Sequence, residues 1–134
     1  DSSTSRGLGD VYKIQHLYPA PVLELIKKIN VKGMAHITGG GLTENIPRIL
    51  KKGLIADVEL STWKFPKAFL WLQEKGKIST EDMLRIFNCG IGMVCILDQK
   101  EVSKAQKILS SYKLRSFEIG SITKGNLEGR IQYN

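Results

Sequence analysis

The sequence predicts an α/β sandwich, in which a mixed β-sheet carries helices mainly on one face. Strand-like alternation and helical periodicity follow one another along the chain, and Gly, Pro, Asn or Asp bound most of these segments. Two strand-like segments at the end of the chain have no helix between them, which predicts a terminal hairpin. A length of 134 residues, with 42% hydrophobic and 25% charged residues, is typical of one globular domain with its own core.

The first part of the chain is predicted to precede the domain. Residues 1–17 show no helical period and are expected to form a linker or an edge segment, with a short strand at 11–17, whereas the domain is expected to span 18–134. The chain opens without an initiator methionine, so we expect a fragment of a longer protein. Prolines at 19 and 21 suit the first turn of a helix that stops at Asn30 or Gly33. Its expected apolar stripe is Val22, Leu25, Ile26 and Ile29.

The next segments predict a strand, a helix and a strand. Residues 34–38 alternate as a short strand does, and Ile46, Ile49 and Leu50 have helical spacing. This second helix is expected to end at residues 51–53, where two lysines and a glycine complement the helix dipole. Its first turn contains Pro47, so either Thr43 or Asn45 is its N-cap. Residues 56–60 then alternate as a half-buried strand does.

Two helices and a buried strand are predicted next. The first helix opens at Pro66 and ends at Gly76, and a capping box at Ser79 opens the second. A continuous apolar run at 94–97 is typical of a strand that is buried on both faces and central in its sheet. The first helix carries Phe69, Leu70 and Leu72, and the second has Met83, Ile86 and Phe87 on one face. Their aromatic residues and methionine are expected in the core.

The last predicted elements are a helix and two strands. Asp98 is expected to cap the helix, with Glu101 in the reciprocal position. Residues 116–122 and 128–133 read as two strands joined by a turn at 124–126. The expected buried stripe of the helix is Val102, Ala105, Ile108, Leu109 and Tyr112.

A glycine run follows the first predicted strand of the domain. The order strand, Gly39-Gly40-Gly41, helix resembles a phosphate-binding layout, because backbone without side chains lets an anion approach the free N–H groups of a helical turn. Neither of the common glycine fingerprints of nucleotide-binding loops is present. A run that only lets the strand turn tightly into the helix is equally compatible with these residues.

A second glycine motif, Asn88-Cys89-Gly90-Ile91-Gly92, precedes the buried strand. Glycines at the entrance of a strand allow either a bulge or the close approach of a ligand. His36 and Thr38 share one face of the earlier strand and are expected to point toward the mouth of the glycine run. An imidazole there could act as an acid or a base, although a lone histidine is more often structural.

Composition excludes several function classes. The net charge is +7, but its lysines are scattered in pairs on helix faces, which favours solvated surfaces over a nucleic-acid stripe. No apolar run is long enough to span a bilayer and the polar start is not a secretory signal, so a cytoplasmic protein is expected. Cys89 and Cys95 are expected to be reduced and buried, too far apart along one strand for a disulfide. The sequence shows no acidic cluster for Mg²⁺ and no metal-ligand set.

Two motifs support a family resemblance. The segment 35–48, with His-Ile-Thr-Gly-Gly-Gly and Glu-Asn-Ile-Pro-Arg, closely resembles the opening of the C-terminal domain in the phosphoribosylformylglycinamidine cyclo-ligase (AIR synthetase) family. Residues 87–94 are similar to that family's second signature, in which a methionine commonly stands where this chain has Cys89. Residues 119–120 and 125–130 are similar to its C-terminal strand and turn. The likeness extends over residues 18–134.

The resemblance implies an enzyme of purine biosynthesis that closes the imidazole ring of formylglycinamidine ribonucleotide with ATP, giving 5-aminoimidazole ribonucleotide, ADP and phosphate. ATP and Mg²⁺ would be bound mainly by an N-terminal domain absent from this chain, on which the family homodimer is largely built. This chain would supply glycine-rich loops for the phosphate of the substrate or the phosphate in transfer. The residues implied are Thr38, Gly39, Gly40, Gly41 and Asn45, then His36, Asn88, Gly90 and Gly92.

The sequence alone leaves other functions open. Related ATP-dependent enzymes share this two-domain plan, namely selenophosphate synthetase, thiamine-monophosphate kinase, the hydrogenase maturation dehydratase and formylglycinamidine ribonucleotide synthase. An RNA-binding module would need exposed aromatic residues in a strand motif that this chain does not contain. A regulatory domain would bind a small ligand without any second domain, which an affinity measurement would show.

Overall fold

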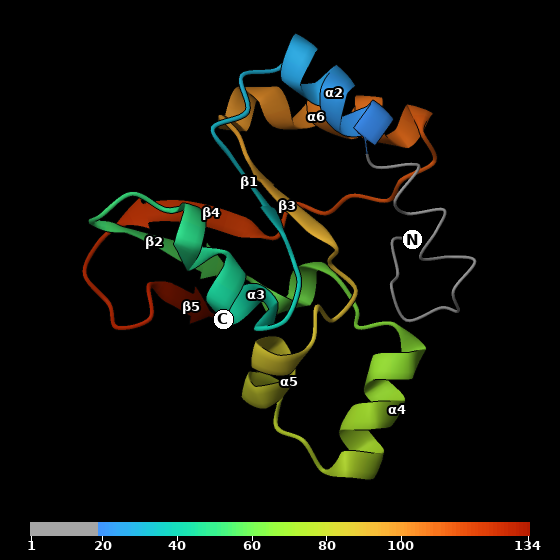
Figure 1. Ribbon diagram of the computed structural model, residues 1–134, viewed down its shortest axis with the longest axis vertical. Helices are drawn as coiled ribbons and strands as arrows, with labels where there is room; N and C mark the ends of the chain where they lie inside the picture. The colour runs from blue at the N-terminus through green and yellow to red at the C-terminus, as the bar shows by residue number, and fades with distance from the viewer. Residues whose placement is uncertain (1–18) are drawn as a thin grey trace.

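The computed structural model describes residues 19–134, along which helices and strands are interspersed (Figure 1). This arrangement confirms the predicted α/β class. The strand expected at 11–17 and the domain boundary expected before residue 18 lie outside the described residues. The elements are α2 (Pro19–Lys28), β1 (Gly33–His36), α3 (Gly41–Asn45), the 3-10 helix η1 (Pro47–Ile49), β2 (Leu54–Val58), η2 (Leu60–Thr62), α4 (Lys67–Gly76), α5 (Thr80–Ile86), β3 (Met93–Ile96), η3 (Gln99–Glu101), α6 (Val102–Ser111), β4 (Gly120–Lys124) and β5 (Ile131–Tyr133).

The strands form two sheets. Strands β1 and β3 pair antiparallel, with His36 opposite Met93. The other sheet has the order β4-β2-β5 and is mixed, because β2 runs antiparallel to β4 and parallel to β5. The mixed pairing expected from the sequence is therefore present, but in a three-stranded sheet separate from β1 and β3.

The prediction that β3 is the central strand of its sheet is wrong, because β1 is its one partner strand within residues 19–134. Its continuous apolar run has another cause. Val94 and Ile96 pack on the main core, whereas Cys95 and its neighbour Leu97 pack on the cluster between α2 and α6. The strand is apolar on both faces because it separates two clusters of buried side chains.

The predicted terminal hairpin is also wrong. Strands β4 and β5 pair with opposite edges of β2, so Asp57 lies opposite Ser121 on one side and Gln132 on the other. Arg130, at φ 61°, begins this return, and its guanidinium donates to the Leu50 carbonyl at 3.1 Å and the Leu54 carbonyl at 3.3 Å. These bonds hold the start of β5 against the chain that enters β2.

The main core lies between the two sheets and helices α3, α4 and α5 (Figure 1). The Trp63 indole N–H donates to the carbonyl of Cys89 at 3.0 Å, so the polar edge of this buried ring is satisfied. The buried members of the main core are Ala35, Ile37, Leu42, Ile46, Leu50, Ala56, Val58, Trp63, Phe69, Met83, Leu84, Cys89 and Ile91.

A smaller cluster joins α2 to α6, which lie side by side in Figure 1. The Tyr112 hydroxyl donates to the Glu24 carboxylate at 2.7 Å, across 88 positions of sequence. Asp98 forms a 2.7 Å ion pair with Lys32 and makes no capping bond, so the predicted Asp98 cap is wrong, and α6 begins at Val102 after a 3-10 turn. The buried apolar members of the smaller cluster are Leu25, Ile29, Ala105 and Ile108.

Three apolar side chains of the predicted helical stripes and faces are exposed, namely Ile26 at 53%, Leu70 at 49% and Ile86 at 53%. The short helices that carry them bury a stripe narrower than the periodicity predicts, and on α5 it is Leu84, at 1% exposed, that lies in the core.

The predicted Ser79 cap is confirmed, since its side chain accepts from the Asp82 amide at 3.1 Å. No helix in the described part of the chain is long and apolar enough to cross a membrane.

The contact of Glu24 with Tyr112 predicts a pH dependence of stability. The Tyr112 hydroxyl, and next the Lys28 ammonium, lower the pKa of Glu24 below its ordinary value of 4.5. A carboxyl with a lowered folded-state pKa stabilises the fold above its unfolded pKa, and this contribution is lost as the pH falls through the folded value. We expect urea unfolding to show wild type more stable than Glu24→Gln at pH 7, with the difference shrinking below pH 4.5. A difference that stays constant down to pH 3 would contradict the assignment.

Candidate functional site

The glycine run forms a tight turn into α3. Gly40, at φ 97°, is the N-cap, and Gly41, at φ 58°, is the first helical residue. Neither of the expected caps, Thr43 or Asn45, therefore caps the helix. Pro47 lies beyond α3 and opens η1, because a residue without an N–H cannot continue the ladder of helical hydrogen bonds. The second helix predicted to reach residues 51–53 is thus split in two and ends at Ile49.

Packing explains two of the three glycines. A Cβ atom on Gly41 would lie 2.2 Å from the Leu84 carbonyl oxygen and 2.5 Å from that of Phe87, so α3 could not approach the end of α5. A Cβ on Gly40 would lie 2.8 Å from the Cβ of Glu44. A Cβ on Gly39 would meet nothing within 4 Å, and Gly39 is exposed. Tight turning therefore accounts for Gly40 and Gly41 but not for the glycine at position 39.

Asn45 is buried, at 6% exposed, and its side chain faces the turn. Its amide nitrogen donates to the carbonyl oxygens of Thr38 and Gly39, each at 3.3 Å, and of Gly41 at 2.8 Å. Its carbonyl oxygen accepts from the Thr38 hydroxyl at 3.5 Å and from Arg48 at 3.3 Å. The Asn45 side chain, which was predicted to contact a phosphate, thus makes its hydrogen bonds to residues of the turn and to Arg48.

Exposed polar groups surround Gly39. His36 and Thr38 are both exposed at the end of β1, as expected for residues on one face of a strand. Among residues 19–134 the structure gives the His36 ring no hydrogen bond, and it gives the Gly39 and Gly40 amides no acceptor, whereas the Gly41 amide donates to Thr38 at 3.0 Å. This turn therefore holds two amides that have no acceptor among the described residues, beside the exposed His36.

The second glycine motif lies at the same end of the β1–β3 pair (Figure 1). Because the two strands are antiparallel, the turn after β1 meets the loop before β3, and the Ile37 amide donates to the Gly92 carbonyl at 3.0 Å. The Asn88 side chain accepts from the Gly90 amide at 2.8 Å. A Cβ on Gly90 would lie 2.6 Å from Pro66, so this glycine is required by packing.

One polar contact at the turn was not indicated by the sequence. The hydroxyls of Thr43 on α3 and Tyr133 on β5 lie 2.7 Å apart, separated by 90 positions of sequence. Burial, the larger effect, raises the pKa of Tyr133 to about 12, against a smaller lowering by the Thr43 hydrogen bond. The Tyr133 hydroxyl therefore stays neutral and braces α3. No local motif marks either residue, because their contact depends on how β5 returns to β2.

Both cysteines are free thiols, as predicted: Cys89 is buried and Cys95 half-buried. Burial raises the pKa of Cys89 to about 12 and that of Cys95 to about 11. Neither sulfur is a reactive thiolate at neutral pH. Among the described residues, no three His, Cys, Asp or Glu side chains are grouped to hold a metal ion.

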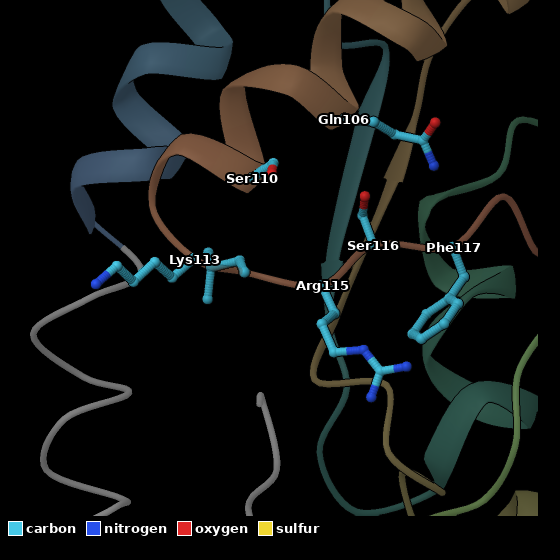
Figure 2. A pocket seen from close by; sticks show the side chains of 7 residues that line it. Gln106, Ser110, Lys113, Arg115, Ser116 and Phe117 are labelled. Carbon is cyan, nitrogen blue, oxygen red and sulfur yellow. The ribbon is translucent and has the colours of Figure 1, made fainter.

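A shallow hollow of about 570 Å³ lies elsewhere, at the end of α6 and along the segment that follows it (Figure 2). The Arg115 guanidinium lies 5.4 Å from the centre of the Phe117 ring, a cation–π contact. The lining contains no residue of either glycine motif: it consists of Gln106, Ser110, Lys113, Leu114, Arg115, Ser116 and Phe117.

Comparisons with known proteins agree on one family. A family model described as "AIR synthase related protein, C-terminal domain" matches residues 1–132. The phosphoribosylformylglycinamidine cyclo-ligase of Methylobacillus flagellatus is 51% identical over 106 residues, which are 79% of this chain and 31% of that protein. Those of Lawsonia intracellularis and Paraburkholderia phymatum are 46% and 44% identical, over 83% and 87% of this chain and 32% and 33% of theirs. The chain spans about a third of the length of these curated relatives.

Substitutions at Gly39 and Gly41 should differ in their effects on stability. We expect Gly41→Ala to lower the free energy of unfolding by about 2 to 4 kcal/mol, because the new methyl group meets two backbone carbonyls at a positive φ. Gly39→Ala, in open space, should change it by less than about 1 kcal/mol. Urea unfolding of the two variants measures both values, and equal losses would mean that the turn is packed differently.

Proposed function

The chain belongs to the AIR synthase related family as a C-terminal domain, and on this basis we propose that it is the C-terminal domain of a phosphoribosylformylglycinamidine cyclo-ligase. The parent enzyme would convert formylglycinamidine ribonucleotide to 5-aminoimidazole ribonucleotide in de novo purine biosynthesis. The relatives described above carry the cyclo-ligase name, which favours this activity over the related kinases, synthetases and dehydratase. The parent is proposed to be a cytoplasmic homodimer that binds neither nucleic acid nor a membrane.

One observation carries the proposal at the level of geometry. The two glycine motifs, 52 positions apart from Gly40 to Gly92, meet at one end of the β1–β3 pair. There the exposed Gly39 has no packing reason to be a glycine, and the neighbouring amides have no acceptor within the described residues. A phosphate group would fit beside them, since backbone N–H groups without side chains can approach its oxygens closely.

The site residues then divide into two groups by their contacts. Thr38, Gly39 and Gly40 are proposed to contact the phosphate of the substrate or the phosphate in transfer. His36 is proposed to hydrogen-bond the ligand or to act as an acid or base beside it, since its ring is exposed at the same strand end. The remaining candidates, Gly41, Asn45, Asn88, Gly90 and Gly92, make contacts that hold the two loops in place.

The cofactors are proposed to lie mainly on the rest of the parent enzyme. The described residues do not fit a Mg²⁺ site, since they offer no group of carboxylates for it. ATP, when bound, supplies the phosphoryl group that activates the formyl oxygen of the substrate. The family model is described as a C-terminal domain, so the domain that precedes it is the proposed partner across the site.

The activity is tested on the complete parent protein, by measuring ADP release from ATP with formylglycinamidine ribonucleotide added or withheld. Release that depends on the ribonucleotide is the result expected for the cyclo-ligase. Release that does not depend on it, from protein with a cooperative thermal transition, would contradict the proposal and favour another enzyme of the family.

Gly39 provides a test of the phosphate contact. In the parent enzyme we expect Gly39→Val to lower kcat/KM by about 10²-fold, because its side chain would occupy the space in which the phosphate lies. The melting temperature should not change, since nothing lies within 4 Å of the new Cβ. Gly39→Ala is the matched control for size and should fall between the variant and wild type. Gly40 is unsuited to this test, because its φ of 97° strains any substitution. A Gly39→Val enzyme with wild-type kinetics would refute the contact.

A further inference from the structure

We infer, on the basis of the function proposed above, that Asn45 is a positioning residue that turns the amide N–H groups of Gly39 and Gly40 toward the ligand. Its side chain is buried, at 6% exposed, and both its amide nitrogen and its carbonyl oxygen are already hydrogen-bonded to protein groups. It reaches the ligand only through the backbone that it holds.

The bonds of Asn45 fix the direction of three carbonyl groups. Its amide nitrogen lies 3.3 Å from the carbonyl oxygens of Thr38 and Gly39 and 2.8 Å from that of Gly41. These oxygens therefore converge on one point inside the turn. An amide nitrogen carries two hydrogens, so it can serve all three oxygens only by sharing one hydrogen between two of them.

The direction of the carbonyls determines that of the amides. In a planar trans peptide group the C=O of one residue and the N–H of the next point in opposite directions. When Asn45 draws the Thr38 carbonyl inward, the Gly39 N–H turns outward, and the same holds from the Gly39 carbonyl to the Gly40 N–H. Two successive outward N–H groups form a concavity that suits the oxygens of an anion.

The other end of the Asn45 side chain fixes its orientation. Its carbonyl oxygen accepts from the Thr38 hydroxyl at 3.5 Å and from the Arg48 guanidinium at 3.3 Å. Arg48 is itself held 3.6 Å from the Glu44 carboxylate. With donors on one side and carbonyl acceptors on the other, a flip of the amide would place oxygen against oxygen. The residue must therefore combine a donor group and an acceptor group at this length, as asparagine does.

A matched control exists on the same helix. Tyr133→Phe removes the 2.7 Å hydrogen bond to Thr43 of α3 but touches none of the three carbonyls. It lowers the stability of the helix contact without releasing the peptide groups of the turn. Asn45→Ala removes the side-chain donor to all three carbonyls and leaves the Thr38 carbonyl with the Gly41 amide as its donor. Comparing the two variants separates loss of orientation from loss of stability.

The experiment uses the complete parent protein labelled with ¹⁵N-glycine. Inorganic phosphate is titrated while the Gly39 and Gly40 amide signals are followed, and KM for formylglycinamidine ribonucleotide, kcat and the melting temperature are measured for wild type and both variants. We expect phosphate to shift both amide signals in wild type. Asn45→Ala should lose these shifts and raise KM by at least about 10-fold, whereas Tyr133→Phe should keep the shifts and a KM within about twofold of wild type.

Three results would overturn the inference. Wild-type Gly39 and Gly40 signals that do not respond to phosphate would show that their amides face no ligand, whether or not Asn45→Ala folds. An Asn45→Ala enzyme with wild-type shifts and KM would show that the side chain is not needed. Equal rises of KM in Asn45→Ala and Tyr133→Phe would assign both to stability. If only the proposed function fails, phosphate still shifts the two amide signals in wild type and not in Asn45→Ala. ADP release from ATP then does not depend on the ribonucleotide.

Discussion

The pairing of β1 with β3 is the constraint on which the rest of the structure depends. It places the Ala35 and Ile37 side chains in the main core, and it lets β3 contact that core on one face and the α2–α6 cluster on the other. Because the pair is antiparallel, the same register brings the turn after His36 beside the loop before Met93. The arrangement of the core and the meeting of the two glycine motifs thus follow from one set of backbone hydrogen bonds.

In the proposed function, the glycine turn would meet structural and functional demands at adjacent positions. Gly41 lets α3 pack against the carbonyl end of α5, and Gly40 takes the left-handed conformation that starts the helix. Gly39 meets neither demand. A ligand-binding turn must be rigid as well as accessible, since groups that are already oriented lose less freedom when they bind. On our proposal, the buried Asn45 amide would supply the rigidity, and the open space at Gly39 would supply the access.

Local signals predicted most helices and strands but not every helix cap, and they predicted long-range structure poorly. The alternation at 56–60 and the Ser79 cap predicted β2 and the start of α5 correctly, because both depend on neighbouring residues. The predicted hairpin of β4 and β5 was wrong because β2, which lies between them, comes more than 60 positions earlier in the sequence. At the site, the motifs indicated the turn and the second loop. The brace from Tyr133 could not be foreseen, since nothing near it in sequence marks its partner.

The exposure of the site argues that another surface completes it. His36, Thr38 and Gly39 all lie open to solvent. In water, two backbone amides bind a phosphate weakly, because each new hydrogen bond replaces one to solvent and charges are strongly screened. The same donors become effective when water is excluded and the local dielectric constant falls. The chain spans about a third of the length of its curated relatives, and we propose that the rest of the parent enzyme supplies such a cover. On this proposal, the turn is one wall of a composite site.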